Sequence, residues 1–358
     1  MLRAVARVDL GAIERNCARL AAAAAPARLC AVVKADGYGH GAVPAARAAQ
    51  AGGAAWLAVA TAGEAAGLRA AGVGGPLLIL GALSDEEIPV ALAARADVVA
   101  WNEGFVAALR GEAGVHVKLD TGMGRLGTRD PEEATRVADA VEAAPGLRLA
   151  GAMTHFATAD EPDDGFMAEQ LAAFRPWAAR MAERGALIHA ANSAATLREP
   201  SSHYDIVRCG IAIYGMDPFH RDPAEQELEP ALELASYVAA VKRIEPGQSA
   251  GYGRRFIADR ETWLGTVPIG YGDGVRRALT NNADVLVDGR RVPVVGTVSM
   301  DNVTVDLGDA PVAVGAEAVL IGARGGERIL AEDVAARLGT INYEITCGIT
   351  ARVPREHR

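Results

Sequence analysis

Residues 29–41 read Leu-Cys-Ala-Val-Val-Lys-Ala-Asp-Gly-Tyr-Gly-His-Gly, a short apolar run that ends in a lysine and enters a glycine-rich segment. Residues 29–34 are typical of a buried strand. A doubly wound open sheet would normally carry a glycine-rich turn directly after its first strand, where this chain has Lys34. The stretch therefore favours a barrel of parallel strands with a polar residue at the first strand end.

The rest of the first two thirds of the chain repeats this pattern of an apolar run followed by an alanine-rich helical segment. Helical signals include 130–143, which opens with Asp130-Pro-Glu-Glu, and 166–184. Eight repeats over about 230 residues predict a (β/α)8 barrel, for which about 250 residues is typical. The eight expected strands are 29–34, 56–61, 76–81, 97–101, 115–119, 147–154, 187–192 and 206–214.

From about residue 233 the pattern changes to short β-branched runs with turn residues between them. Expected strands here include 237–244, 263–268, 284–287 and 292–298. Asp288-Gly289 between two valine-rich runs predicts a hairpin. We therefore expect two domains, a barrel over 1–232 and a mostly β domain over 233–358.

The composition excludes several classes of function. A net charge of -9, with isolated basic pairs, argues against nucleic-acid binding. The alanine run 21–25 is too short and too weakly apolar to cross a membrane. Four scattered cysteines show no metal-binding spacing, so we expect no metal and a reducing environment. With no targeting signal at the N-terminus, a cytoplasmic location is expected.

Unusual polar residues stand where the predicted strands end. The carboxyl ends of barrel strands converge on one face, where the sites of such proteins are built. The residues concerned are Lys34, Lys118, His155, Asn192, Ser193 and, within the last strand, Arg208.

Each of these residues also has a purely structural explanation. Lys34 could extend its amine into water, or it could be a desolvated nucleophile between glycines that let a ligand approach. Arg208 in an apolar strand needs an anion or an acceptor, and Asp205 would satisfy it as an ion pair. Lys118 could meet Asp120 or solvent. Tyr252, in a glycine-flanked turn, could be an ordinary half-buried tyrosine.

Eight motifs follow one another along nearly the whole chain. They are Ala31–Gly41, Val117–Gly127, Met153–Ala157, Ala191–Ser193, Arg208–Gly215, Ile269–Gly274, Val298–Asp301 and Arg352–Arg355. Together they resemble the motifs of the alanine racemases, and that family's barrel and β domain agree with the architecture expected from the residue pattern.

The resemblance implies a pyridoxal 5'-phosphate (PLP) enzyme that interconverts L- and D-alanine and supplies D-alanine for peptidoglycan. Lys34 matches the lysine that carries PLP and moves one of the two α-protons. Arg208 matches the residue that faces the pyridine nitrogen, where a guanidinium donates a hydrogen bond but keeps its proton. The implied phosphate contacts are Tyr38, Ser193 and the backbone amides of Gly210 and Ile211, with Asn192 close by.

The second base implied by the resemblance is Tyr252. It arrives from the other subunit of a homodimer and is supported by His155, which is linked in turn to Arg208. Arg125 would hold the substrate carboxylate, assisted by the backbone of Met300 from the partner. Lys118 matches a lysine that is carbamylated in many relatives, where it orients the arginine.

Two positions depart from the family pattern. Ala351 stands where some members have a tyrosine on the cofactor phosphate, and Thr297 where some have an arginine in the entrance corridor. The other corridor positions match at Asp160, Tyr271, Arg277 and Ile349. Three alternatives stay open at this point: a racemase of another small amino acid such as serine, a PLP decarboxylase of basic amino acids, and a non-catalytic PLP-binding protein.

Overall fold

The computed structural model describes residues 2–358, which form two compact units. One unit is Ile13–Ile213. The other combines Tyr214–Arg358 with the N-terminal residues up to Ala12.

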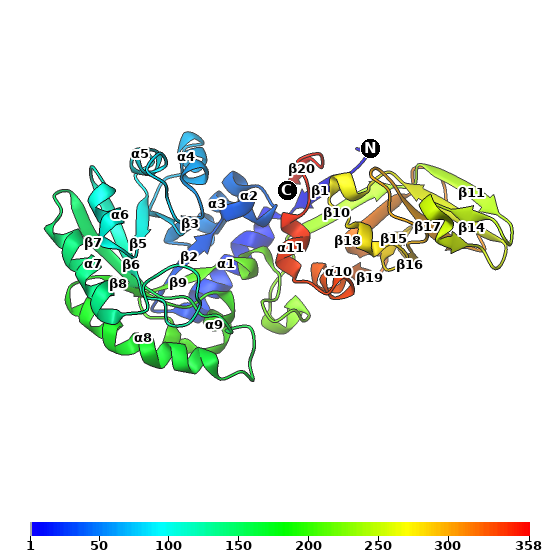
Figure 1. Cartoon of the computed structure of the whole chain (residues 1–358). Coiled ribbons are helices and arrows are strands. Elements are labelled where there is room, and N and C mark those ends of the chain that lie inside the picture. Colours follow the sequence, from blue (N-terminus) through cyan, green and yellow to red (C-terminus); the bar gives the residue numbers. More distant parts are fainter. Residues whose placement is uncertain (1) are drawn as a thin grey trace. The chain divides into compact units, whose positions relative to one another are not determined.

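The unit Ile13–Ile213 is built around eight parallel strands, with helices on their outer side (Figure 1). The strands pair in the order β8-β7-β6-β5-β4-β3-β2-β9. The backbone amides of Asp205 and Arg208 donate to the carbonyls of Ile188 and Ala191 at 3.0 and 2.9 Å, which brings β9 back against β8. The strands are β2 (Arg28–Val32), β3 (Trp56–Val59), β4 (Leu77–Ile79), β5 (Asp97–Ala100), β6 (Ala113–Lys118), β7 (Leu147–Met153), β8 (Leu187–His189) and β9 (Ile206–Cys209).

This arrangement confirms the predicted (β/α)8 barrel and all eight of its strands. The strands are buried on both faces, which is why they are recognisable as continuous apolar runs. Most predicted strands are a few residues too long at their carboxyl ends. The run predicted as 206–214 leaves the sheet after Cys209 and continues as the 3-10 helix η2 (Ile211–Tyr214).

The helices between the strands bury one apolar face each. In α8 (Phe166–Glu183) the buried residues Leu171, Phe174, Trp177, Ala178 and Met181 recur at helical spacing. In α7 (Pro131–Ala143) Asp130 accepts a hydrogen bond from the backbone of Glu132 and caps the helix, as its sequence predicts. The remaining helices are α1 (Leu10–Ala24), α2 (Lys34–Tyr38), α3 (Ala42–Ala51), α4 (Ala62–Ala70), α5 (Ile88–Ala93), α6 (Glu103–Ala108) and α9 (Ser193–Arg198).

The second unit is mostly β, as predicted. Its largest sheet has the order β16-β15-β18-β10-β1-β20, with β19 paired to β18, and β11-β14-β17 form a smaller sheet. Helices α10 (Ala331–Leu338) and α11 (Asn342–Cys347) complete it. The strands are β1 (Val5–Val8), β10 (Leu232–Tyr237), β11 (Ala240–Ile244), β12 (Ser249–Ala250), β13 (Phe256–Ile257), β14 (Thr262–Val267), β15 (Asp284–Val287), β16 (Arg290–Pro293), β17 (Val303–Gly308), β18 (Glu317–Arg324), β19 (Glu327–Ile329) and β20 (Arg355–His357).

The hairpin predicted at Asp288-Gly289 is present between β15 and β16. Val287 pairs with Arg290, so the turn has two residues. Asp288 and Gly289 have φ of 51° and 72°, and two positive φ values in succession are those of a type I′ turn.

The N-terminal strand lies in the β unit and not in the barrel unit. Strand β1 pairs antiparallel with β10 and parallel with β20. We expected β1 within a barrel domain of 1–232, because nothing local to β1 indicates partners more than two hundred residues away. The two compact units divide between Ile213 and Tyr214.

No helix within residues 2–358 is long and apolar enough to cross a membrane.

One carboxylate connects the start of α4 to the residue that follows Lys34. Glu64 Oε2 accepts hydrogen bonds from the backbone amides of Ala60 and Thr61 at 2.8 and 3.1 Å. Its other oxygen, Oε1, accepts from the amide of Ala35 at 2.6 Å. Glu64 thus closes the capping box of α4 and also fixes the backbone at the end of β2.

We predict that Glu64→Ala lowers the free energy of unfolding by about 2 kcal/mol, because three backbone donors lose a charged acceptor. Urea unfolding followed by circular dichroism measures the change. The control is Glu132→Ala, in the first turn of α7, where an exposed carboxylate pairs with Arg180. This control should change stability by less than about 0.5 kcal/mol. Equal losses in the two variants would contradict the role given to Glu64.

Candidate active site

Lys34 begins a segment of left-handed backbone at the carboxyl end of β2. Residues Ala35, Asp36, Gly37 and Tyr38 have φ of 52°, 52°, 61° and 53°. Such a conformation costs about 1–2 kcal/mol for each non-glycine residue, so neighbouring groups must hold it in place. Glu64 accepts from the amide of Ala35, and the Asp36 side chain accepts from the amide of Ala42 at 2.9 Å.

The left-handed turn brings Tyr38 against the loop that follows β9. Tyr38 is buried, and a Cβ built on Gly210 would lie 2.9 Å from its Cζ and still closer to its Oη. Ser193 Oγ accepts from the amide of Gly210 at 3.0 Å. Tyr38, Ser193 and Gly210 therefore meet at one place, and only a glycine fits at position 210.

Asn192 positions Ser193 through the start of α9. Its Oδ1 accepts from the amide of Ala195 at 3.0 Å and caps the helix. The side chain of Asn192 therefore holds the loop that presents Ser193. Ile211 follows Gly210 directly and opens η2.

Arg208 is buried at the centre of the site and is surrounded by acceptors that carry no charge. Nη1 donates to Nδ1 of His189 at 2.9 Å. Nη2 donates to the carbonyls of Thr154 and Ala190 at 2.9 and 3.0 Å and lies 3.2 Å from Nδ1 of His155. None of these four bonds uses Nε, which remains as a donor for a ligand.

Burial and mutual repulsion shape the charges of this site. Burial lowers the pKa of Arg208 to about 10, so the guanidinium stays protonated at neutral pH. Burial and then the Arg208 charge hold the pKa of His155 well below its ordinary value, so this ring is neutral. Burial, followed by Arg208 and Arg125, lowers the pKa of Lys118 to about 8.

The loop after β6 carries Arg125 on a compact turn. Asp120 Oδ1 accepts from the amides of Gly122 and Gly124 at 3.0 and 3.1 Å. Gln170 on α8 is fully buried and joins this loop to the next one: it donates to Thr121 Oγ1 and to the carbonyl of His155 at 3.3 and 3.1 Å. Arg125 itself is exposed.

Tyr252 and Met300 belong to the β unit and lie on its surface. Tyr252 is 75% exposed and Met300 51%, which is unusual for such large apolar side chains in a folded unit. Thr297 Oγ1 donates to the carbonyl of Tyr252 at 2.6 Å, so this side chain holds the turn that carries the tyrosine. Ala351 is exposed.

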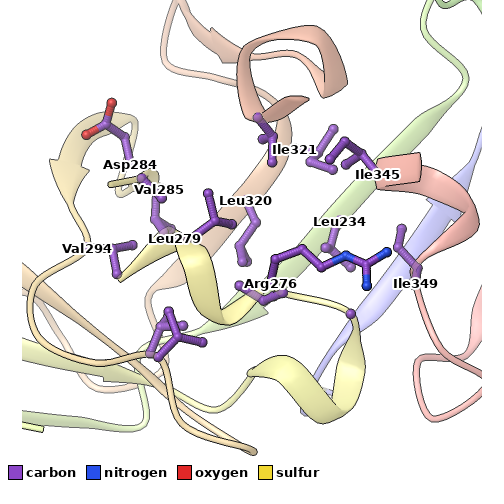
Figure 2. Close-up of a pocket in the computed structure, with 16 residues that line it drawn as sticks. Leu234, Arg276, Leu279, Asp284, Val285, Val294, Leu320, Ile321, Ile345 and Ile349 are labelled. Atoms are coloured by element: carbon purple, nitrogen blue, oxygen red, sulfur yellow. The ribbon is translucent and has the colours of Figure 1, made fainter. Parts of the chain in front are cut away.

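An apolar cavity of about 40 Å³ lies inside the β unit, lined by aliphatic side chains such as Leu279, Val285 and Leu320 (Figure 2). Two charged residues also line it, and each has an ion-pair partner: Arg276 with Glu344 and Asp284 with Arg337. Ligand pockets are typically about 300–1,000 Å³ and contain converging polar groups. This cavity is therefore a gap in the core, and Ile349, expected in an entrance corridor, is one of its buried lining residues.

Comparison with known proteins matches the chain over nearly its full length. Residues 8–218 match the model of the alanine racemase N-terminal domain, and residues 231–357 match that of the alanine racemase C-terminal domain. The chain belongs to the alanine racemase family.

Individual family members are similar in both sequence and structure. An alanine racemase of Symbiobacterium thermophilum is 43% identical, with 98% of this chain and 96% of the relative covered. Alanine racemase 1 of Bacillus subtilis is 41% identical, with 98% and 92% covered. The crystal structure of alanine racemase from E. faecalis superposes with a TM-score of 0.94 at 37% identity, with 99% of this chain and 98% of that chain covered.

Alanine racemases depend on PLP, and the barrel contains groups that fit this cofactor. A phosphate needs hydroxyl and amide donors where the backbone can approach closely. Tyr38, Ser193 and Gly210 form such a cradle, in which a single Cβ at position 210 would collide. A pyridine nitrogen needs a donor, and Nε of Arg208, which none of the four bonds to Arg208 uses, could serve as one.

The structure brings most of the predicted site residues of this family member together within the barrel unit. Tyr38 meets Ser193 and Gly210, and His155 meets Arg208. Two structural explanations from the sequence are wrong. Asp205 accepts from the amide of Ile188 and not from Arg208, and the carboxylate of Asp120 is occupied by its own loop and by Arg129 at 3.4 Å and not by Lys118.

Several residues of the site were not predicted from the sequence. His189 contacts Arg208 directly, His116 contacts His189, and Gln170 links two loops of the barrel mouth. The histidines could have been noticed, because each lies in or at the end of a strand that is otherwise apolar and a buried histidine needs partners. Nothing local marks Gln170, since its partners come from distant loops.

We predict that Gly210→Ala weakens PLP binding at least about tenfold, because the added Cβ displaces Tyr38 Oη and two or more hydrogen bonds to a charged group are lost or strained. Equilibrium dialysis against PLP measures the dissociation constant. Gly67→Ala is the control, since a Cβ there has nothing within 4 Å. Unchanged PLP binding in Gly210→Ala would place the phosphate elsewhere.

Proposed function

We propose that the barrel mouth of this chain binds PLP and interconverts L- and D-alanine, with Lys34 and Tyr252 as the two bases. The observation that carries this assignment is the environment of Arg208. Its acceptors are carbonyls and neutral imidazoles, so its charge and its Nε donor remain available to the cofactor. A PLP decarboxylase would need a carboxylate in this place.

PLP, when bound, withdraws electrons from the α-carbon of the amino acid, so that the α-proton becomes acidic. Arg208 limits this effect, because a guanidinium with a pKa of about 10 donates a hydrogen bond to the ring nitrogen without giving up its proton. A moderate electron sink suits proton exchange at one carbon better than transamination or decarboxylation. In this proposal Tyr38, Ser193 and the amides of Gly210 and Ile211 hold the phosphate.

Lys34 is the residue best placed to carry the cofactor. The sequence contains three lysines, at positions 34, 118 and 242. Lys242 is exposed on β11 of the β unit, whereas Lys34 follows β2 directly and is four residues from Tyr38. Lys34 would hold the cofactor, and its amine would also move the proton on one face of the α-carbon.

Tyr252 of a second copy serves the opposite face. A phenol accepts a proton poorly at neutral pH unless neighbouring donors stabilise its anion. His155 supplies such a donor: Nδ1 accepts from Arg208, so its single proton lies on Nε2 and points away from Arg208. A homodimer also accounts for the exposure of Tyr252 and Met300, which the partner's barrel would cover.

Arg125 binds the substrate carboxylate in this proposal, with the backbone of Met300 of the partner. Lys118 lies close to Arg125, Arg208 and Lys34. Burial lowers the pKa of Lys118, and the positive charges of these three residues, which repel a protonated Lys118, lower it further. Because the pKa of Lys118 is about 8, a fraction of its amine is neutral near pH 7 and can react with carbon dioxide. The resulting carbamate would be an anion among cations and would orient Arg125.

Alanine is the proposed substrate, in preference to serine. Ala351 is exposed and Thr297 is bonded to the backbone of Tyr252, so neither position adds a polar group for a serine hydroxyl. The product D-alanine would serve peptidoglycan synthesis. The cysteines at positions 17, 30, 209 and 347 form no disulfide within residues 2–358, which suits the reducing cytoplasm that we propose as its location.

We expect Lys34→Ala to remove covalently attached PLP and to reduce racemisation in both directions by at least about 10³-fold, since the cofactor-bearing base is lost. Borohydride reduction followed by peptide mass spectrometry locates the attached cofactor. Lys242→Ala is the matched control and should behave as wild type. PLP found on Lys118 or Lys242 of the wild-type protein would contradict the assignment.

We expect Tyr252→Phe to keep PLP bound and to lose proton transfer on one face. Solvent deuterium uptake, measured separately from L- and D-alanine, should fall much further for one enantiomer than for the other. Tyr237→Phe, on β10 of the same unit, serves as control. Equal uptake from both enantiomers at wild-type rates would rule out Tyr252 as a base.

A further inference from the structure

A chain of hydrogen bonds runs across the barrel from Arg208 in β9 to Asp97, the first residue of β5. Nη1 of Arg208 donates to Nδ1 of His189 at 2.9 Å, and Nε2 of His189 lies 2.8 Å from Nδ1 of His116. Nε2 of His116 lies 3.3 Å from Oδ2 of Asp97. Arg208 is in β9, His189 ends β8, His116 is in β6, and Asp97 opens β5.

Arg208, which can only donate, and Asp97, which accepts as a carboxylate, set the direction of the protons in this chain from its two ends. A guanidinium has no acceptor, so Nδ1 of His189 must present its lone pair. A neutral imidazole then carries its proton on Nε2 and donates it to Nδ1 of His116. His116 in turn carries its proton on Nε2 and donates it to Asp97. The reverse direction would place two donors against each other at Arg208.

Both histidines must be neutral for the chain to exist. A second proton on either ring would oppose a donor across 2.8 or 2.9 Å. Burial and the Arg208 charge hold the pKa of His189 well below its ordinary value, which agrees with this requirement. The far end of the chain needs an acceptor, and Asp97 supplies a charged one.

Two glycines make room for the chain. A Cβ on Gly151 of β7 would lie 2.7 Å from Cε1 of His116 and still closer to its Nδ1. A Cβ on Gly114 of β6 would lie 2.5 Å from Oδ1 of Asp97. Trp56 packs against His116 edge-on, with 5.7 Å between ring centroids. The imidazole of His116, which is fully buried, therefore occupies a closely fitted place.

The chain also gives Arg208 a distant partner of opposite charge. Within residues 2–358 no carboxylate lies at ion-pair distance from Arg208, although its side chain is buried. The negative charge at the far end is Asp97, whose Oδ2 also lies 3.5 Å from Arg148 near the surface. Two polarised imidazoles connect the two charges, and hydrogen bonds in such series strengthen one another.

We propose that Asp97 and His116 are positioning residues for the racemase reaction: they complete the hydrogen-bond chain that begins at Arg208, and so hold the ring of His189, and with it the guanidinium of Arg208, in place toward the cofactor ring. This inference rests on the proposed function in so far as it concerns the cofactor. The tautomers themselves are properties of this chain alone. A structural role for Asp97 would be satisfied by any hydrogen-bonding side chain, whereas the proposed role needs an anion that can only accept.

The test is Asp97→Asn in the PLP-loaded protein labelled with ¹⁵N-histidine. Long-range ¹H–¹⁵N spectra between pH 6 and 8 report which nitrogen of each ring carries the proton. In the wild type, His116 and His189 should each carry one proton, on Nε2. The side-chain amide introduced by Asp97→Asn can donate as well as accept, so this variant should give mixed tautomers for His116 and shifted signals for His189. The value of kcat should fall about tenfold to a hundredfold with KM nearly unchanged, the range for loss of an outer hydrogen-bond partner.

The matched control is Arg148→Gln, which removes the other partner of Asp97 and leaves the chain intact. It should keep the wild-type spectra and kcat. Wild-type His189 signals in Asp97→Asn, an equal change in Arg148→Gln, or a wild-type proton on Nδ1 of His189 would each overturn the proposal. Changed tautomers with an unchanged kcat would also overturn it. A wild-type protein without racemase activity would refute the proposed function, while its histidine spectra would still decide the hydrogen-bond chain.

Discussion

A guanidinium can donate hydrogen bonds but cannot accept them, and Arg208 carries this restriction into the interior of the barrel. Every group around it must therefore be an acceptor. These groups come from the ends of β7 and β8: the carbonyls of Thr154 and Ala190 and the rings of His155 and His189. One side chain thus ties together the three strands at which the barrel closes, and it dictates the protonation of both histidines.

The same restriction connects the structure to the chemistry. A carboxylate beside Arg208 would neutralise it and compete with the cofactor for its donors. Neutral acceptors instead satisfy its buried N–H groups and leave its charge in place. The four acceptors bind only Nη1 and Nη2, so Nε of Arg208 is not used by them. Because Nδ1 of His155 accepts from Arg208, the proton of this ring lies on Nε2.

The fold was largely predictable from the sequence because its signals are local. Eight apolar runs, each buried on both faces, marked the strands, and Asp288-Gly289 marked a two-residue turn whose φ values require such residues. The convergence of Lys34, His155, Ser193 and Arg208 followed from barrel geometry, although their chemical roles came from the resemblance to a family.

What could not be predicted depends on partners far away along the chain. The left-handed turn at Ala35–Tyr38 is held by Glu64 and Asp36, and no local pattern indicates four successive positive φ values. His116 and His189 are separated by 73 positions, so their contact is invisible before the strands are placed. The pairing of β1 with β20 joins the two ends of the chain for the same reason.

That pairing of chain ends has a consequence for synthesis on the ribosome. Strand β1 is translated before the whole barrel unit, but its neighbours β10 and β20 follow some two hundred residues later or more. The whole segment Ile13–Ile213 is translated in between, with all eight of its own strands, and can fold as one domain. β1 must therefore wait with its hydrogen-bonding edges unpaired, and the β unit can be completed only after Arg355–His357 leave the exit tunnel.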